Sequence, residues 1–369
     1  MLIRCLFIIF LVLFIGCDKR WGHGIDLTDK NNTPSDLPTP TNTPDVVLDE
    51  LVVSVTDGGD LSKYLIKIDN TGVITKIANQ NWDTTKPNTL IKFNNKIYFF
   101  GGDSSKATGD EIYSLDTEDN IELVADIDPT NTAIGKRGKA IFNNKLHVTA
   151  YSATDSAFKI YTVDTDNNVA KLITSGIDYW NPVWFCVFNT NMYFSAASTG
   201  VTAEVFKLTP SNVVSKVSNI NSGRSNPSGL VVFMDKLFLV AQGASGYELY
   251  EMDAGETFTQ VRPTATQIVM SGGAHLGTFG TMLWFVANIA PTGSRFWEMD
   301  DSYNLTPYNF TGTADPMSYP IEFINRLYFT GINWSSTFNI QIHYIDNTPS
   351  IFLDNTLLDY LDAQDFVVR

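Results

Sequence analysis

Polar turns and short apolar runs follow one another along most of the chain. The clearest example is FNNKIYFF at 93–100, in which an aromatic residue and two Asn precede an apolar run. Two Asn flanked by apolar residues are typical of a tight β-hairpin. The pattern recurs as FNNKLHV from 142, FNTNMYF from 188, FMDKLFL from 233, FGTMLWF from 279 and FINRLYF from 323, with a weaker copy, VLDELVV, from 47. The six clear copies start 49, 46, 45, 46 and 44 residues apart, which indicates a structural repeat.

Each repeat carries three further strand-like segments. A strand, a polar turn and another strand come about 20 residues after each anchor, as in DEIYSLDTEDNIELV and YELYEMDAGETFTQV, and this pair occurs seven times. A period in the mid-forties built from four strands indicates an all-β fold, a β-propeller. We expect seven blades of about 46 residues, with six to eight left open.

The strand that leads into each anchor predicts how the ring closes. Six anchors are preceded by such a strand, and the seventh strand, AQDFVVR at 363–369, has no anchor after it. The first anchor, at Val47, lacks one. We therefore expect the last residues to complete the blade that the first residues begin, which leaves no open edge.

Asp residues are frequent in the turns of the second hairpins, where they could either form the turn or bind calcium. Asp and Asn suit hairpin turns because they tolerate positive φ and bond their own backbone. A calcium site is the alternative, but no copy has the D-x-D-x-D-G spacing of an oxygen cage. We expect turn chemistry, and no metal or other cofactor.

The N-terminal segment differs in composition from the rest. Residues 1–17 have an apolar run too short for a stable membrane span, which fits a secretory signal. FIGC at 14–17 resembles the bacterial lipobox, although Phe14 stands where that family has Leu; the resemblance implies lipidation of Cys17. Residues 18–45 are rich in Pro, Thr and Asn and predict a disordered, extended tether. The propeller is expected over 46–369, held on a membrane and facing the periplasm or the cell exterior.

The net charge limits the classes of partner, and the cysteine content limits the thiol chemistry. The net charge is −15, so a nucleic-acid partner is not expected. The three cysteines are Cys5, Cys17 and Cys186; the last lies in WFCVF and is expected to be a small core residue.

Two families resemble these repeats. KIYFFGG followed by DEIYSLD resembles a kelch repeat, although the other copies lack the Gly pair. GDEIYSLD and GYELYEMD are similar to the ELWxxDGT type of extracellular bacterial repeat. The resemblance implies a propeller in a secreted setting and no shared catalytic residues.

No known catalytic pattern is present in the sequence. There is no G-x-S-x-G elbow, phosphate loop, sialidase Asp box or pair of His with zinc-ligand spacing. His147 fills a slot that is aromatic in most other copies and is expected to pack between blades. We name no catalytic residue, while enzymatic activity stays open because propeller active sites assemble from separate loops.

A binding face is predicted instead. The loops that enter the innermost strands should line one face of a propeller, and aromatic and Arg side chains there suit recognition. Packing of the channel mouth is the alternative role for the same side chains. The predicted binding residues are Trp82, Arg137, Trp180, Arg224, His275 and Tyr319.

The resulting expectation is a membrane-anchored, extracytoplasmic binding or scaffold module with a monomeric head that recognises a protein partner through this face. The alternative is a carbohydrate-binding or carbohydrate-active propeller. Trp82 and Trp180 lying beside a carboxylate would favour the alternative. The ligand, the choice of inner or outer membrane, and the oligomeric state do not follow from the sequence.

Overall fold

A computed structural model describes the chain in segments between residues 50 and 368. The chain divides into two units, Met1–Val47 and Leu48–Arg369, and only the second contains described residues. The predicted signal segment, Cys17 and the tether therefore lie outside them. No helix within the described part is long and apolar enough to cross a membrane. The described residues are 50–57, 63–69, 71, 73–77, 82, 87–102, 110–127, 138–221, 225–262, 269–270, 276–288, 294–308, 314–316, 321–323, 326–333, 339–345, 351–353 and 360–368.

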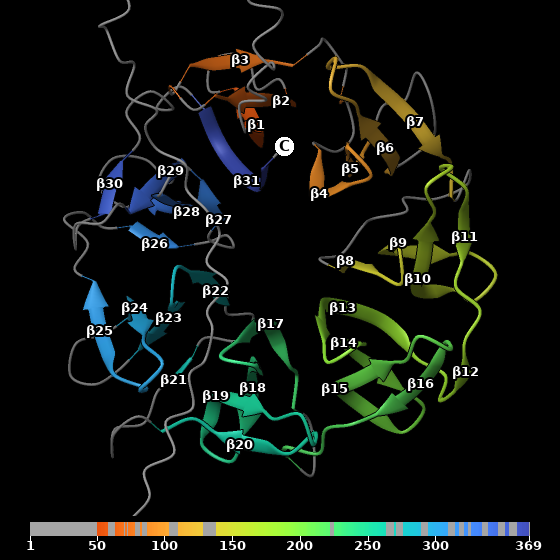
Figure 1. Cartoon of the computed structure of the whole chain (residues 1–369), viewed down its shortest axis with the longest axis vertical. Coiled ribbons are helices and arrows are strands. Elements are labelled where there is room, and N and C mark those ends of the chain that lie inside the picture. The colour runs from red at the N-terminus through yellow and green to blue at the C-terminus, as the bar shows by residue number, and fades with distance from the viewer. Residues whose placement is uncertain are drawn as a thin grey trace, which may run out of the picture. The chain divides into compact units, whose positions relative to one another are not determined.

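The second unit consists of antiparallel sheets arranged around a common axis (Figure 1). The first sheet has the order β3 (Ile74–Lys76), β2 (Lys63–Ile68), β1 (Leu51–Asp57) and β31 (Tyr360–Val368). The next has β4 (Asn88–Phe93), β5 (Lys96–Gly101), β6 (Glu111–Leu115) and β7 (Ile121–Ala125). The third has β8 (Lys139–Phe142), β9 (Lys145–Ser152), β10 (Ala157–Val163) and β11 (Val169–Lys171). The fourth has β13 (Trp180–Phe188), β14 (Asn191–Ser198), β15 (Val201–Leu208), β16 (Val213–Lys216) and β12 (Ser175–Gly176).

The two remaining sheets have nine and five strands. A nine-stranded sheet contains β17 (Ser228–Phe233), β18 (Lys236–Gly243), β19 (Gly246–Met252), β20 (Phe258–Gln260), β21 (Val269–Met270), β22 (Leu276–Phe279), β23 (Met282–Asn288), β24 (Ser294–Met299) and β25 (Leu305–Tyr308). The two-residue strand β21 pairs with both β19 and β23 and so joins two four-stranded series. The last sheet contains β26 (Ala314–Pro316), β27 (Ile321–Phe323), β28 (Arg326–Asn333), β29 (Asn339–Ile345) and β30 (Ile351–Leu353).

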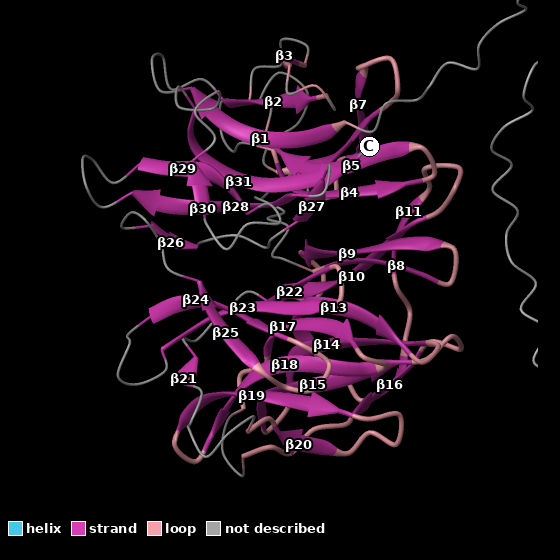
Figure 2. Ribbon diagram, turned by 60° about the vertical axis from the view of Figure 1, so that its left-hand side comes forward, coloured by secondary structure: helices cyan, strands magenta, loops and turns pink. Residues whose placement is uncertain are grey.

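The innermost strand of each series contacts the innermost strand of the next. Going round the axis, these contacts run from β31 to β4, β8, β13, β17, β22 and β27, and then back to β31. The C-terminal strand β31 pairs with β1, with Leu51 opposite Val368 and Val53 opposite Phe366. Radial four-stranded sheets around one axis are the architecture of a β-propeller, as the repeat predicted. Figure 2 shows most of the strands running across the view, with turns at both of their ends.

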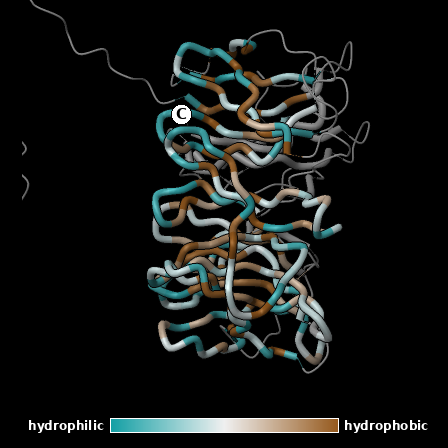
Figure 3. The backbone as a smooth tube through the Cα atoms, turned by 90° about the vertical axis from the view of Figure 1, so that its right-hand side faces the viewer, coloured by the Kyte–Doolittle hydropathy of each residue, from teal (hydrophilic) through white to brown (hydrophobic). Residues whose placement is uncertain are grey.

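Aromatic pairs within the blades form much of the core. The anchor Phe of each of the second to sixth repeats contacts the ring five residues later. These pairs, with their centroid separations, are Phe93–Tyr98 (5.9 Å), Phe142–His147 (5.5 Å), Phe188–Tyr193 (6.1 Å), Phe233–Phe238 (5.6 Å) and Phe279–Trp284 (6.4 Å). His147 is 2% exposed, so the predicted burial is confirmed, while its contact with a neighbouring blade stays a prediction. Burial lowers its pKa to about 4. Along the tube of Figure 3 the strands are mostly hydrophobic and the turns hydrophilic.

The Asp-rich turns bond their own backbone, as predicted. Oδ1 of Asp164 accepts N–H bonds from Asp166 and Asn168, each at 2.9 Å. Asp116, Asp253 and Asp300 bond the same two positions ahead of them. The bonds from Asn168 hold the pKa of Asp164 below its usual value. Each of these carboxylates therefore shapes a hairpin.

Candidate functional site

The two ends of the strands form two different faces. Turns that join first to second strands and third to fourth strands lie at one end, here called the hairpin face. Turns that join second to third strands, and segments that enter the next blade, lie at the other end, the connection face. The predicted binding residues Trp82 and Trp180 belong to segments of the connection face.

Polar groups of the hairpin face bind between neighbouring blades. Such bonds cross every seam from β1–β3 to β22–β25. They are Lys67 to Asp119 (2.6 Å), Tyr98 to Asn167 (2.6 Å), Asn143 to the Pro210 carbonyl (3.1 Å), Tyr193 to Glu256 (2.9 Å) and Lys236 to Tyr303 (2.8 Å). The side chains of this face therefore serve largely to hold the ring together.

One position on the third strand of a blade fastens the segment that leads to the next blade. Glu111 on β6 lies opposite Gly101, and Glu204 on β15 lies opposite Ala196. Both carboxylates are buried, at 0% and 3% exposure. Oε2 of Glu111 accepts the N–H of Ile127 at 2.6 Å, just after β7.

Glu204 holds both ends of its segment. The hydroxyl of Ser218, after β16, donates to Oε2 at 2.5 Å. The hydroxyl of Ser225, before β17, donates to both carboxylate oxygens at 2.7 and 2.8 Å. Glu248 occupies the same position on β19, opposite Ala241, and is also buried. The recurring Glu of the G-x-E-[IL]-Y pattern therefore has a buried, hydrogen-bonded structural place.

Lys159 takes this position in the blade β8–β11 and reverses its polarity. It lies opposite Ala150, and its Nζ donates to the Tyr179 carbonyl at 2.5 Å and to Oδ1 of Asp178 at 2.7 Å. Lys159 is a cationic donor where Glu111, Glu204 and Glu248 are acceptors. The residue at this position varies in the remaining blades, which carry Tyr64, Arg295 and Gln341. The carboxylate that pairs with Lys159 is that of Asp178, in the segment that enters β13.

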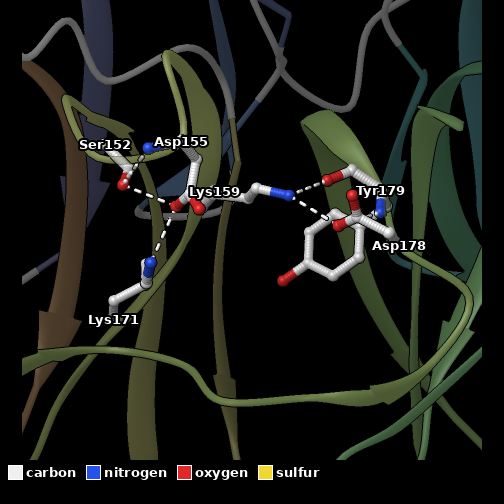
Figure 4. A network of polar contacts seen from close by, with 6 residues as sticks. All are labelled: Ser152, Asp155, Lys159, Lys171, Asp178 and Tyr179. Carbon is white, nitrogen blue, oxygen red and sulfur yellow. Dashed lines mark hydrogen bonds and ion pairs between the residues drawn. The ribbon is translucent and has the colours of Figure 1, made fainter.

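A second ion pair lies beside Lys159, as Figure 4 shows. Asp155, in the turn between β9 and β10, accepts from Lys171 Nζ at 2.7 Å and from the Ser152 hydroxyl at 2.6 Å. These two bonds lower the pKa of Asp155, and the bond to Asp155 raises the pKa of Lys171. The two Lys and two Asp of this cluster balance in charge.

Trp180 follows directly in the chain. It begins β13, lies opposite Ala197 and is half-buried. The register of β13 shifts between Trp180 and Val183, and such bulges re-aim side chains. The side chain of Asp178 is 76% exposed.

Trp82 has a different environment from Trp180. It is 4% exposed and packs edge-on against Phe99 (5.6 Å) and Tyr113 (5.0 Å). Tyr179 has the equivalent place in a later blade: it is 3% exposed and packs edge-on against Phe194 at 5.4 Å. Trp82 therefore matches Tyr179 rather than Trp180, and its ring fills the interior. Only Trp180 of this pair is available at the surface.

The other predicted binding residues lie outside the described residues; they are Arg137, Arg224, His275 and Tyr319. Lys159, Asp178 and Asp155 were not among the residues predicted from the sequence. Aligning the third strands could have found the first, because AFKIYTVD has Lys where GDEIYSLD and GYELYEMD have Glu.

Cys186 behaves as expected for an unreactive thiol. It is partly buried beside an apolar cluster and is free of any disulfide. Burial raises its pKa to about 12, so the thiolate form is negligible at neutral pH. Within the described part of the chain, no group of three or more His, Cys, Asp or Glu is arranged to hold a metal ion.

Exposed aliphatic side chains gather next to the Lys159 cluster. The segment from β11 to β13 first forms β12, which pairs in parallel with β16, Ser175 lying opposite Val213. Ile173, Ile177 and Val213 flank this pairing and are 76%, 43% and 40% exposed. Gly176 permits the contact: its φ is +94°, and a Cβ there would lie 2.2 Å from the Val214 carbonyl oxygen.

Comparison with known proteins supports the fold alone. No family model and no curated protein sequence matches the chain. The puromycin-hydrolysing peptidase of Mycobacterium tuberculosis is similar in structure, with a TM-score of 0.59 and 10% identity over 83% of this chain and 51% of that one. The oligogalacturonate lyase of Vibrio parahaemolyticus has a TM-score of 0.51 and 9% identity over 82% and 84%.

A third similar structure is the β-propeller domain of the Trilobed protease of Pyrococcus furiosus, with a TM-score of 0.57 and 11% identity over 84% of this chain and 92% of that one. That propeller has an open velcro topology, whereas here β1 and β31 pair. The chain spans about half the length of the mycobacterial peptidase. Structural similarity at such low identity supports the propeller fold and nothing further. The kelch and ELWxxDGT resemblances rest on their sequence motifs alone.

Proposed function

We propose that this protein is an extracytoplasmic binding module, held on a membrane through its N-terminus, that recognises a partner through the connection face. The observation that carries this proposal is the difference between the two faces. Polar side chains of the hairpin face bind across the seams between blades. The connection face instead presents Asp178 and Trp180 to solvent.

A protein is the first candidate partner. Ile173, Ile177 and Val213 make three of the six exposed large hydrophobic side chains among the described residues, and all three flank one strand pairing. Exposed apolar side chains gathered in this way are typical of protein contact surfaces. They lie along the outer edge of the blade, where β12 pairs with the start of β16, so the proposed protein contact extends from the connection face onto this edge. A glycan is the second candidate, favoured by the half-buried Trp180 two residues after the exposed Asp178.

The direction of β1 shows at which end of its sheet the described part of the chain begins. Leu51 begins β1 opposite Val368, at the hairpin-face end of the sheet. Glu50, the first described residue, therefore lies at the hairpin-face end of this sheet.

We also infer seven blades. The nine-stranded sheet contains two four-stranded series, β17–β20 and β22–β25, which β21 bridges. Counted in this way, the innermost strands form a closed series of seven in which β31 completes the first blade. The lipobox, the signal segment and the kelch-like character of the repeats belong to the same proposal and rest on the sequence.

Crosslinking capture in cells of the source organism tests the function. Wild type is compared with a variant carrying Ile173→Ser and Ile177→Ser, a variant carrying Trp180→Ala, and the control Glu118→Gln on the exposed hairpin face. We expect a protein captured by wild type and by the control but lost from the Ile variant. Capture that is equal in all four, or no captured protein, would refute a protein-docking connection face.

Anchoring has a separate test. Cys17→Ser removes the thiol that lipidation requires, so we expect the protein to leave the membrane fraction for the soluble fraction. A Cys5→Ser variant serves as the matched control and should be processed like wild type. A Cys17→Ser protein that stays with the membranes would show that the lipobox interpretation is wrong.

A further inference from the structure

Residues 173–177, which include β12, form the outer edge of the sheet β12–β16–β15–β14–β13 (Figure 1). The N–H groups of Ser175 and Ile177 donate to carbonyls of the β15–β16 hairpin at 3.0 and 3.1 Å. In a trans peptide the carbonyl points opposite to the N–H of the same unit, so the carbonyls of Thr174 and Gly176 point away from β16. Ser175 and Gly176 are both exposed, so this edge is open to another strand.

The side chains along this edge divide into an inner and an outer set. Thr174 lies on the inner side, since its side chain hydrogen bonds the buried Tyr179. Side chains alternate along a strand, so Ile173, Ser175 and Ile177 share the outer side. All three are exposed, and a strand paired with this edge would cover part of both Ile side chains.

The edge lacks the residues that usually protect an outer strand from pairing with another chain. Charged side chains and Pro give that protection. Four other outer strands carry one of them, namely Lys76 in β3, Glu122 in β7, Lys171 in β11 and Pro307 in β25. The sequence LITSGI at 172–177 has neither, and the three-residue strands β20 and β30 also lack them. Among the described residues, only the β12 edge combines this lack with exposed large aliphatic side chains.

The charges beside the edge suit a second copy of this acidic chain. The net charge is −15, so two copies repel each other over most of their surface. Both ends of the edge are instead neutral, because Lys171 pairs with Asp155 and Lys159 pairs with Asp178, each at 2.7 Å. Repulsion between two copies is therefore lowest here, and the centres of protein interfaces are likewise depleted in charged residues.

The edge is also complementary to itself. Two copies of it paired antiparallel about Ser175 would place Thr174 opposite Gly176 of the second copy, so that their outward backbone groups bond each other. Ile173 would lie opposite Ile177 of the second copy. Apolar side chains that meet across adjacent strands stabilise a sheet.

We propose that two copies of this protein join edge to edge through residues 173–177, related by a twofold axis at Ser175. Such an isologous contact uses the same surface on both copies, as in most homodimers. It also brings the Lys171 end of each copy beside the Asp178 end of the other, so opposite charges meet. The proposal rests on the proposed function in one respect, that this aliphatic edge is a protein contact surface. It replaces the monomeric head expected from the sequence with a dimer.

Disulfide trapping in intact cells tests the dimer with the full-length protein. Ser175→Cys places one exposed thiol on the proposed axis, and Ser302→Cys, in the exposed turn between β24 and β25, is the matched control. Opposite residues of an antiparallel pair lie about 4.5–5.5 Å apart, within the range that a disulfide bridges. Pairing raises the effective concentration of the two thiols, so mild oxidation should give at least about tenfold more linked dimer of this chain from Ser175→Cys than from the control. Wild type measures any background from the native cysteines.

Further variants test the register and the apolar contact. Chains with Ile173→Cys and chains with Ile177→Cys should link when both are expressed in one cell, and much less when either is expressed alone, because the proposed pairing places each opposite the other. Adding Ile173→Ser and Ile177→Ser to the Ser175→Cys chain should remove most of the linked dimer. The thermal midpoints should match wild type, since all three side chains are exposed.

Three results would overturn the proposal: Ser175→Cys links no more than Ser302→Cys, the Ile173→Cys and Ile177→Cys chains link no better together than apart, or Ser175→Cys is trapped with a different protein instead of a second copy. The last result would support the protein contact surface of the proposed function while rejecting the dimer. A linked dimer together with no different protein in the capture experiment would keep the dimer and reject recognition of a partner.

Discussion

Deleting residues 363–369 should unfold the whole propeller rather than fray its end. The deletion removes four of the six positions at which β31 pairs with β1, those opposite Leu51, Val52, Val53 and Ser54. All four of these β1 side chains are 0% exposed, so the edge that would be uncovered belongs to the interior. At about 0.5–1.5 kcal/mol net for each backbone hydrogen bond, roughly four bonds amount to about 2–6 kcal/mol.

That loss is large on the scale of folding. Globular domains are stable by about 5–15 kcal/mol, and the lost bonds come before any apolar burial is counted. The sheet β3–β2–β1–β31 also separates the strands β4 and β27, which β31 contacts on either side. The damage should therefore spread round the ring as one cooperative loss.

Urea unfolding followed by tryptophan fluorescence measures the effect. We expect a lower midpoint for all blades together, observed as one transition. A synthetic peptide of residues 360–369 should restore part of the lost stability by pairing with β1, and a scrambled peptide of the same composition should not. A truncated protein with the wild-type midpoint would refute closure by the C-terminal strand.

Three smaller changes test individual contacts. His147→Phe should make stability less sensitive to acid: burial places the folded pKa at about 4, below the ordinary value, so wild type loses about 2 kcal/mol as the pH falls from 7 to 5 and the variant should not; parallel pH profiles in urea melts would contradict this. Thr149→Val removes the 2.6 Å bond to the Pro182 carbonyl and should cost about 1–3 kcal/mol, checked against the exposed control Thr117→Val. Gly176→Ala should speed amide exchange at Ile177, which donates to Val214, while leaving β4–β7 unchanged; equal protection at Ile177 would show that the contact tolerates a side chain.

The periodic parts of the fold could be predicted from the sequence. Anchors such as Phe93 and Phe142 repeat because every blade needs the same aromatic pair, and Asp164 and Asp253 repeat because every outer hairpin needs the same backbone bonds. The closing strand could also be predicted, because the first anchor, at Val47, has no strand leading into it and the last strand, at 363–369, has no anchor after it. Alternation of apolar and polar residues and the residue types of turns depend on neighbours in the chain, so they can be recognised in the sequence.

The candidate site was predicted less well because it depends on contacts between blades. Trp82 and Trp180 look alike in sequence, but their segments enter the blades differently, and the ring equivalent to Trp82 is Tyr179. The pairing of Lys159 on β10 with Asp178, in the segment between β12 and β13, follows from no local pattern. The short parallel strand β12 has no sequence signal because it is two residues long.

The pairing of β1 between β2 and β31 also determines how the domain would bear a mechanical load. A pull on the chain that precedes Leu51 acts along β1, whose partners lie antiparallel on both sides for most of its length. Such a force loads the two ladders in shear, so many hydrogen bonds resist it together instead of opening one after another. Both ladders belong to the sheet β3–β2–β1–β31, so this blade bears such a load before any other blade does.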